Sequence, residues 1–175
     1  MLNFISTNKE FSILDVGCGT GVLFEFLKNN TDCKFNYTGI DYVVDMLVKA
    51  SEKYANIDNV SFLSKDLIKI SERFDYVVSS GVFNVKLDVD DKDWLINMTD
   101  TIKLMFECCN KGIVFNVLTN YVDFTENRLH YSDPLLIFDF CQKRLSRYVK
   151  LNQGYPLYEY TLAVYKDGYI KNKTD

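Results

Sequence analysis

The chain is poor in the residues and segments that mark linkers, disulfide frameworks and membrane spans. It has only 2 prolines in 175 residues, and no low-complexity tract or repeat divides it. Its 5 cysteines are odd in number and lack the paired spacing of a metal site, so we expect free thiols. No apolar run is long enough to span a bilayer, and residues 1–10 lack a signal-peptide pattern. We therefore expect one cytoplasmic domain without a membrane partner.

Positive charge is also scarce. The formal net charge is -4, and no run of lysine or arginine stands out. A phosphate backbone needs such a basic surface, so we expect no nucleic-acid partner. Hydrophobic residues, in contrast, make up 47% of the chain, which is enough for a full core.

A glycine-rich loop follows the first apolar segment. Residues 11–16 have the pattern of a strand, and Gly17, Gly19 and Gly21 follow at alternate positions before a helix expected from Val22. Glycine lets the main chain turn sharply and approach a ligand closely. The free N–H groups and the positive dipole end of the helix would then bind a nucleotide-like ligand or its carboxylate.

The spacing of this loop argues against two common nucleotide fingerprints. The dinucleotide fingerprint needs its third glycine three residues after the second, where this chain has Val22, so a nicotinamide oxidoreductase is disfavoured. The phosphate loop needs Lys-Ser/Thr after its last glycine, and Val22-Leu23 follow here. Asp15 followed by alternating glycines instead resembles the cofactor loop of the class I S-adenosylmethionine-dependent methyltransferases.

Residues after the next three expected strands extend this resemblance. Asp41 ends the strand expected over 35–41, where a carboxylate can bind both ribose hydroxyls. Asp66 follows the strand expected over 60–65, at the position that the resemblance assigns to the adenine. The cofactor positions implied by the resemblance are Asp15, Gly17, Cys18, Gly19, Gly21, Asp41, Tyr42, Asp66, Leu67, Ser79, Ser80 and Gly81.

Three of these positions also have a purely structural interpretation. Asp41 fits a solvated turn, and Asp66 fits the N-cap of a short segment over 67–72. Tyr42, which would flank the adenine, also fits a core aromatic before the next helix.

The rest of the chain alternates between helix and strand patterns. The resemblance implies a doubly wound, Rossmann-like α/β fold. Its mostly parallel, seven-stranded sheet has an antiparallel C-terminal strand and helices on both faces. The resemblance covers about residues 11–166 of a single domain, which we expect to span 1–175. We expect the polar tail 167–175 to fray. The expected helices span 44–54, 91–109 and a segment from Pro134, and the expected later strands span 74–81, 112–118, 149–155 and 159–166.

The segment before the first expected strand is short. Many members of this family carry one or two helices there that cover the cofactor, whereas this chain has about ten residues. We therefore expect a short or missing N-terminal cover. The pocket would then be more open, or be closed by another segment or by a second copy in a homodimer; a truncated chain is a further alternative.

The chemistry depends on the cofactor that the resemblance implies. A methyl on a sulfonium sulfur is already activated, so transfer is an in-line displacement that leaves S-adenosylhomocysteine. A general base is needed only when the acceptor must lose a proton. His130, the sole histidine, is a candidate base with Tyr131 beside it, although a loop histidine also fits a solvated surface residue. The acceptor candidates are Phe83, Asn84, Asn120 and Tyr121.

The acceptor class is argued mainly from motifs that the chain does not contain. The segment after the fourth expected strand lacks Asp/Asn-Pro-Pro-aromatic, and neither proline precedes a cysteine, which disfavours nucleic-acid base methylation. Asp88, Asp90 and Asp91 fit a solvated helix start, so we expect no metal. The leading interpretation is O- or N-methylation of a small molecule. A noncatalytic cofactor-binding subunit of the same fold and a protein side-chain methyltransferase remain alternatives.

Overall fold

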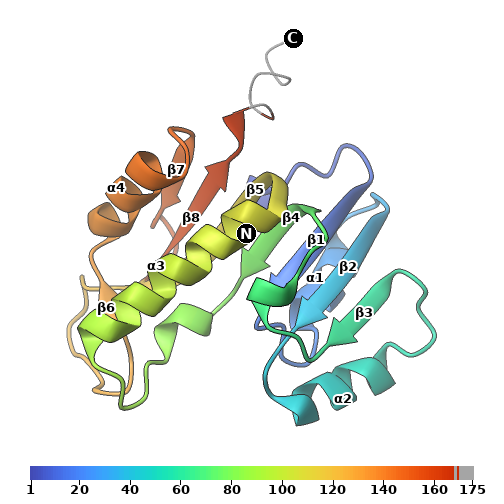
Figure 1. Ribbon diagram of the computed structural model, residues 1–175, viewed down its shortest axis with the longest axis horizontal. Helices are drawn as coiled ribbons and strands as arrows, with labels where there is room; N and C mark the ends of the chain where they lie inside the picture. The colour runs from blue at the N-terminus through green and yellow to red at the C-terminus, as the bar shows by residue number, and fades with distance from the viewer. Residues whose placement is uncertain (168, 170–175) are drawn as a thin grey trace.

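A single mixed sheet organises the protein (Figure 1). The computed structural model describes residues 1–167 and 169, so most of the tail 167–175 lies outside the described residues. The strands are β1 (Phe11–Val16), β2 (Phe35–Ile40), β3 (Val60–Leu63), β4 (Phe74–Ser79), β5 (Cys109–Thr119), β6 (Tyr131–Ser132), β7 (Val149–Asn152) and β8 (Glu159–Tyr165). The helices are α1 (Val22–Asn30), α2 (Val44–Lys53), α3 (Asp91–Cys108) and α4 (Pro134–Arg144), and the short 3-10 helices are η1 (Leu2–Phe4), η2 (Leu67–Lys69) and η3 (Val82–Asn84).

The strand order creates a crevice at one edge of the sheet. The main path runs β3-β2-β1-β4-β5-β8-β7, and the two-residue β6 pairs with the end of β5. β8 runs antiparallel to both β5 and β7, while β1 to β5 are mutually parallel where they pair. The chain leaves β1 towards β2 and later returns to β4 on its other side. This reversal is the switch point where parallel α/β sheets bind ligands.

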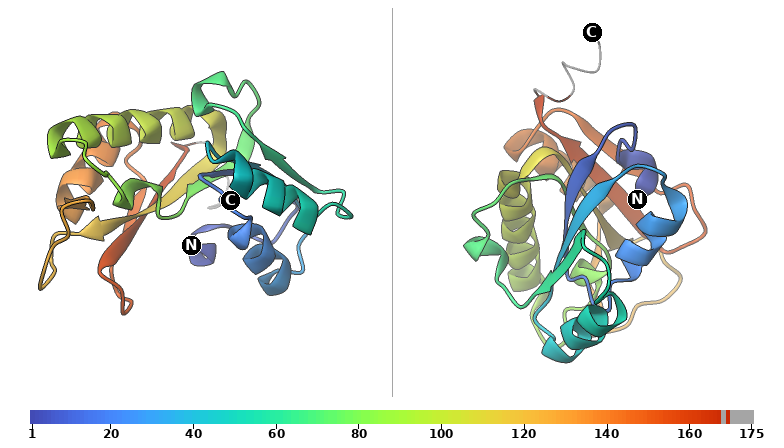
Figure 2. Two further views of the ribbon diagram at one scale, coloured as in Figure 1. Left: turned by 90° about the horizontal axis from the view of Figure 1, so that it is seen from below. Right: turned by 90° about the vertical axis from the view of Figure 1, so that its right-hand side faces the viewer.

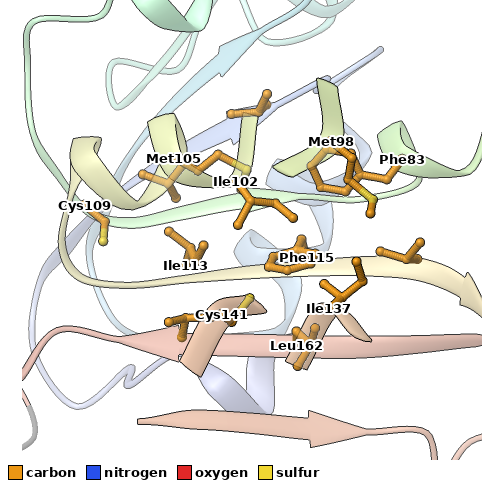
Figure 3. Close-up of a cluster of buried hydrophobic side chains, with 14 of the residues drawn as sticks. Phe83, Met98, Ile102, Met105, Cys109, Ile113, Phe115, Ile137, Cys141 and Leu162 are labelled. Atoms are coloured by element: carbon orange, nitrogen blue, oxygen red, sulfur yellow. The ribbon is translucent and has the colours of Figure 1, made fainter. Parts of the chain in front are cut away.

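Helices cover both faces of the sheet. α3 and α4 lie on one face, and α1 lies on the other (Figure 2). Figure 3 shows the first layer: Met98 and Ile102 from α3 and Ile137 from α4 pack on Phe115 and Leu162. On the opposite face, α1 contributes buried aromatic and aliphatic side chains to a second cluster. The sheet is therefore apolar on both sides, as the nearly continuous hydrophobic pattern of β5 predicts.

Local signals set the starts of the two long helices on the first face. The Asp90 carboxylate accepts from the Lys92 N–H at 2.8 Å before α3, and the Asp133 carboxylate accepts from the Leu135 N–H at 2.8 Å before α4. Pro134 then begins α4 at the position where its missing N–H costs no helix bond. The predicted start of α4 is confirmed.

Several predicted boundaries are wrong by a few residues. β3 ends at Leu63 instead of Lys65, and β7 ends at Asn152 instead of Tyr155. Cys109 begins β5 and does not belong to α3, because the chain turns directly from helix into strand there. All 5 cysteines are free thiols. Among the described residues, no helix combines the length and the apolarity that crossing a membrane requires.

Candidate cofactor site

A cavity of about 890 Å³ opens at the switch point of the sheet. Its lining combines the ends of β1, β2 and β4 with η2, α2 and α3. Seven of the predicted cofactor residues line it: Gly17, Asp41, Tyr42, Asp66, Leu67, Ser80 and Gly81. The structure therefore brings together residues that lie up to 64 positions apart in the sequence.

The glycine loop needs the backbone freedom of its glycines. Gly17, Gly19 and Gly21 have φ values of 76°, 52° and 78°, a region that other residues rarely adopt. A Cβ on Gly17 would lie 2.1 Å from Cγ2 of Val82, so the turn after β4 packs directly on the turn after β1. Around the half-buried Gly19, in contrast, a Cβ would meet no atom within 4 Å, although Gly19 is not among the residues that line the cavity.

Asp41 ties the end of β2 to the glycine loop. Its Oδ2 accepts from the Gly19 N–H at 2.8 Å, and its Oδ1 accepts from the Val43 N–H at 2.9 Å. Each carboxylate oxygen has a second lone pair, so the group can accept further bonds from a diol. Asp41 thus holds the glycine loop in place through the Gly19 N–H and also lines the cavity. The alternative interpretation, a solvated turn residue, explains neither of these two features.

The adenine candidates Tyr42, Asp66 and Leu67 also line the cavity. Tyr42 is 76% exposed, so the alternative of a core aromatic is wrong. Asp66 occupies the N-cap position of η2, as the alternative interpretation expected, but its side chain makes no capping hydrogen bond. Its carboxylate pairs with Lys69 at 2.7 Å, and this contact holds the pKa of Asp66 below its usual range. Leu67 is buried and lines the cavity.

Two buried polar groups lie on the strands below the loops without lining the cavity. The Tyr37 hydroxyl donates to Oδ2 of Asp15 at 2.5 Å, but Oδ1 of Asp15 has no partner among the described residues. Burial raises the pKa of Asp15 to about 7, although the Tyr37 bond opposes the shift. The Ser79 hydroxyl is likewise buried without a partner in the described chain. Both groups are enclosed by the protein, so they belong to the interior beneath the loops and not to the cavity wall.

Two further predicted cofactor positions have structural surroundings of their own. Cys18 is buried against Gly39, where a Cβ would lie 2.7 Å from its Sγ, and burial raises its pKa to about 12. Gly21 starts α1 and packs against Tyr54 and Phe62. Neither lines the cavity. Both residues pack against neighbouring elements and so hold the glycine loop in place without lining the cavity.

The predicted acceptor residues lie outside the cavity lining. Phe83 is buried and meets the Phe115 ring edge-on at 5.7 Å between centroids. Asn84 accepts from the Leu118 N–H at 3.0 Å and so joins the loop after β4 to β5. Asn120 and Tyr121 are exposed on the loop after β5.

His130 is buried, so the interpretation as a solvated surface residue is wrong. It is only 4% exposed; its Nδ1 lies 3.2 Å from Oδ1 of Asp91, and its Nε2 has no partner among the described residues. Its backbone N–H donates to the Asn84 carbonyl at 2.9 Å. The neighbouring Tyr131 hydroxyl accepts from the Glu126 N–H. Neither ring lines the cavity, and His130 joins the loop after β5 to the start of α3.

Sequence reasoning missed part of the cavity wall. Val82 and Val85 come shortly after Gly81, so the small residues at the end of β4 were the signal that could have found them. Thr101 and Leu104 are on α3, and only the packing of that helix over the crevice brings them to the site. The remaining lining residues that were not predicted are Val16, Ile40, Met46, Lys65 and Ile68. Within the described part of the chain, no group of three His, Cys, Asp or Glu side chains could hold a metal ion.

The fold and the site together define a class of protein. The sheet order, the glycine loop after β1 and the acid after β2 are those of Rossmann-like proteins that bind a nucleoside cofactor at the switch point. A family model described as a methyltransferase domain matches residues 13–103, which contain the glycine loop, the acid after β2 and strands β2 to β4. The chain belongs to the class I S-adenosylmethionine-dependent methyltransferase family, and S-adenosylmethionine is the cofactor.

Individual relatives agree with this assignment. One relative is a Mycobacterium tuberculosis protein named as a methyltransferase. It is 35% identical over 167 residues, which cover 94% of this chain and 99% of that protein. A malonyl-[acyl-carrier protein] O-methyltransferase of Bacillus anthracis is 30% identical over 103 residues, which are 58% of this chain but 34% of that enzyme.

Solved structures share the fold. Magnesium protoporphyrin IX methyltransferase from Synechocystis PCC 6803 with bound SAH superposes with a TM-score of 0.69 at 15% identity, covering 91% of this chain and 75% of that one. The N-methyltransferase NodS from Bradyrhizobium japonicum WM9, in complex with S-adenosylhomocysteine, gives 0.63 at 18% identity, with 89% and 78% covered.

Proposed function

We propose that this protein transfers the methyl group of S-adenosylmethionine to an oxygen or nitrogen of a small molecule. The observation that carries the proposal is Asp41. Its carboxylate lines the cavity while it holds the Gly19 N–H, so one residue couples the ribose position to the shape of the glycine loop. Such preorganisation favours a bound nucleoside because the loop does not have to be ordered on binding.

The residues present fit the cofactor. Asp41 would hold the ribose, Tyr42 and Asp66 would hold the adenine, and Gly17, Ser80 and Gly81 would border its methionine part. The open space beside Gly19 and the bond from its N–H to Asp41 support this assignment. When bound, the cofactor supplies a methyl group already activated by its positive sulfur. The protein then orients the cofactor and excludes water from the reacting atoms.

A small acceptor is supported by charge and by the cavity walls. The chain has a net charge of -4, and the cavity lining includes one basic side chain, Lys65. Such a surface is unfavourable for a phosphate backbone. The relatives named malonyl-[acyl-carrier protein] O-methyltransferases match over 103 and 86 residues, 58% and 46% of this chain, and they leave the acceptor open.

The direct test is product formation. The purified protein would be incubated with S-adenosylmethionine and fractionated metabolite pools, and S-adenosylhomocysteine release would be measured. Release that depends on one fraction supports the proposal and leads to the acceptor. Cofactor binding without release in any fraction, including peptide fractions, would contradict it.

Replacing Asp41 with alanine should weaken cofactor binding. The change removes a charged hydrogen-bond acceptor and the brace on the Gly19 N–H, so we expect a loss of ~1.5 to 3 kcal/mol, or roughly 10- to 150-fold in Kd. Titration calorimetry with S-adenosylhomocysteine measures this change, with Asp58→Ala as a control on the loop before β3. An unchanged affinity would remove Asp41 from the ribose role.

A noncatalytic cofactor-binding subunit is the second candidate. It is favoured by one observation: the sole histidine is buried against Asp91 and does not line the cavity. The titratable residues that line the cavity are Asp41, Tyr42, Lys65 and Asp66. Three of these, Asp41, Tyr42 and Asp66, are assigned to the ribose and the adenine. The release assay separates the two candidates because a binding subunit would retain the cofactor but form no product.

A further inference from the structure

The turn after β4 is held by a side chain from the neighbouring strand. Gly81 lines the cavity with φ at 78°, and its N–H donates to Oδ1 of Asn116 at 2.8 Å. Asn116 comes from β5 and is only 7% exposed. A bond to a buried side chain fixes a backbone group that the strand ladder leaves free at its end.

A carboxylate on the next strand orients Asn116. Its Nδ2 donates to Oε2 of Glu159 at 2.7 Å, and Glu159 is the first residue of β8. An ionised carboxylate only accepts hydrogen bonds, so the amide nitrogen must face Glu159 and the amide oxygen must face Gly81. A flipped amide would set its oxygen against the carboxylate and its N–H groups against the Gly81 N–H. Glu159 therefore fixes which atom Asn116 presents to the Gly81 turn.

The position of the Gly81 turn matters because the next residue, Val82, forms part of the cavity wall. Val82 packs on Gly17 so tightly that a Cβ there would collide with its Cγ2. The turn after β4 and the glycine loop after β1 thus fix each other. A shift of Gly81 would move Val82 and alter both walls of the cavity.

We propose that Asn116 is a positioning residue of the cofactor site. It holds the Gly81 turn, and Glu159 orients its amide across three adjacent strands, β4, β5 and β8. The proposal rests on the proposed cofactor site. Asn116 does not itself line the cavity, so its effect on binding passes through Gly81.

The first test compares two ligands on Asn116→Ala. S-adenosylhomocysteine includes the amino-acid part that the resemblance assigns to the Gly81 turn, whereas adenosine lacks it. We expect the Kd for S-adenosylhomocysteine to rise roughly 5- to 20-fold, as for one lost buried hydrogen bond, and the Kd for adenosine to stay within about twofold. Asn59→Ala is the matched control, because its side chain also bonds a backbone group of a neighbouring strand, but at the far end of β2. It should lower the melting temperature without changing either affinity.

The second test exchanges the amide and the carboxylate between positions 116 and 159. Asn116→Asp alone places two carboxylates in contact, so binding should weaken at neutral pH and recover as the pH falls and one carboxyl takes up a proton. The other titratable groups beside Glu159 are the Met1 amino group and Tyr155. Combining Asn116→Asp with Glu159→Gln restores a donor facing an acceptor at both contacts, and affinity should return to within about threefold of wild type.

The outcomes separate this proposal from the cofactor assignment. It would be overturned if Asn116→Ala bound S-adenosylhomocysteine like wild type, or if both ligands weakened equally. Failure of the exchanged pair to recover, in a variant with wild-type melting temperature, would also overturn it. Failure of the wild-type protein to bind S-adenosylhomocysteine would instead reject the proposed function.

Discussion

At the scale of single residues, Asp15 shows how folding changes the chemistry of a side chain. It is the acid of the glycine-loop motif, yet it lies under the loop and is only 2% exposed. Removal from water penalises its charged form more than the Tyr37 hydroxyl favours it, so its pKa rises to about 7. A carboxyl group in this protein therefore titrates close to neutral pH.

This shift predicts how stability depends on pH. Between about pH 4 and pH 7 the folded protein keeps a proton on Asp15 that the unfolded chain has released, so the free energy of unfolding should fall as the pH rises, by a few kcal/mol. Above pH 7 this contribution should level off. Asp15→Asn should remove the slope, because its side chain stays neutral and can still accept from Tyr37.

Urea unfolding at pH 5 and pH 8 checks this prediction. Ser12→Ala, on the same strand, is a suitable control and should keep the pH dependence of wild type. If the free energy of unfolding of Asp15→Asn fell with pH as steeply as that of wild type, the pH dependence would come from groups other than Asp15.

At the scale of elements, the turns after β1 and β4 behave as one unit. Gly17 has φ at 76° and lies against Val82, so an alanine there meets both backbone strain and a collision. Gly154, in the connection between β7 and β8, has its nearest neighbour at 3.4 Å from a would-be Cβ, and its φ lies outside the left-handed region.

We therefore expect opposite results for the two alanine variants. Gly17→Ala should cost about 1 to 3 kcal/mol from strain alone and should abolish measurable S-adenosylhomocysteine binding, because Val82, which lines the cavity, must move. Gly154→Ala should bind like wild type. Calorimetry and thermal melts on both variants test this, and normal binding by Gly17→Ala would show that the two turns move independently.

At the scale of the whole molecule, stability depends on the layer that α3 makes over the sheet. Ile102 is fully buried in that layer with Met98, Met105 and Phe115 (Figure 3). The same helix carries Thr101 and Leu104 to the cavity wall. The core and the site thus share one element.

Truncating Ile102 should destabilise the protein strongly. Ile102→Ala removes buried methyl groups and leaves a cavity, so we expect a loss of about 2 to 5 kcal/mol in the free energy of unfolding. The exposed Ile96→Ala on the same helix should cost under ~1 kcal/mol. Urea titrations measure the free energy of unfolding of both variants. Equal losses would mean that burial between α3 and the sheet does not account for the contribution of Ile102 to stability.

The sequence by itself determined the fold class, the mostly parallel sheet with its antiparallel C-terminal strand, and the cofactor side of the site. Those features depend on local patterns: alternating or continuous apolar segments, glycines that a turn requires, and acids placed directly after strands. Asp41, Asp66 and Gly81 were predicted from their places after successive strands and from the resemblance to the methyltransferase family, and all three line the cavity.

Only the tertiary structure decided which other side chains reach that edge. Thr101 and Leu104 look like ordinary helix residues until α3 packs over the crevice, and His130 looked accessible until Asp91 and the loop after β4 enclosed it. The link from Glu159 through Asn116 to Gly81 joins residues up to 78 positions apart, so no local pattern could indicate it. Burial and contact across strands depend on the whole packed chain, whereas periodicity and turn chemistry are properties of short segments.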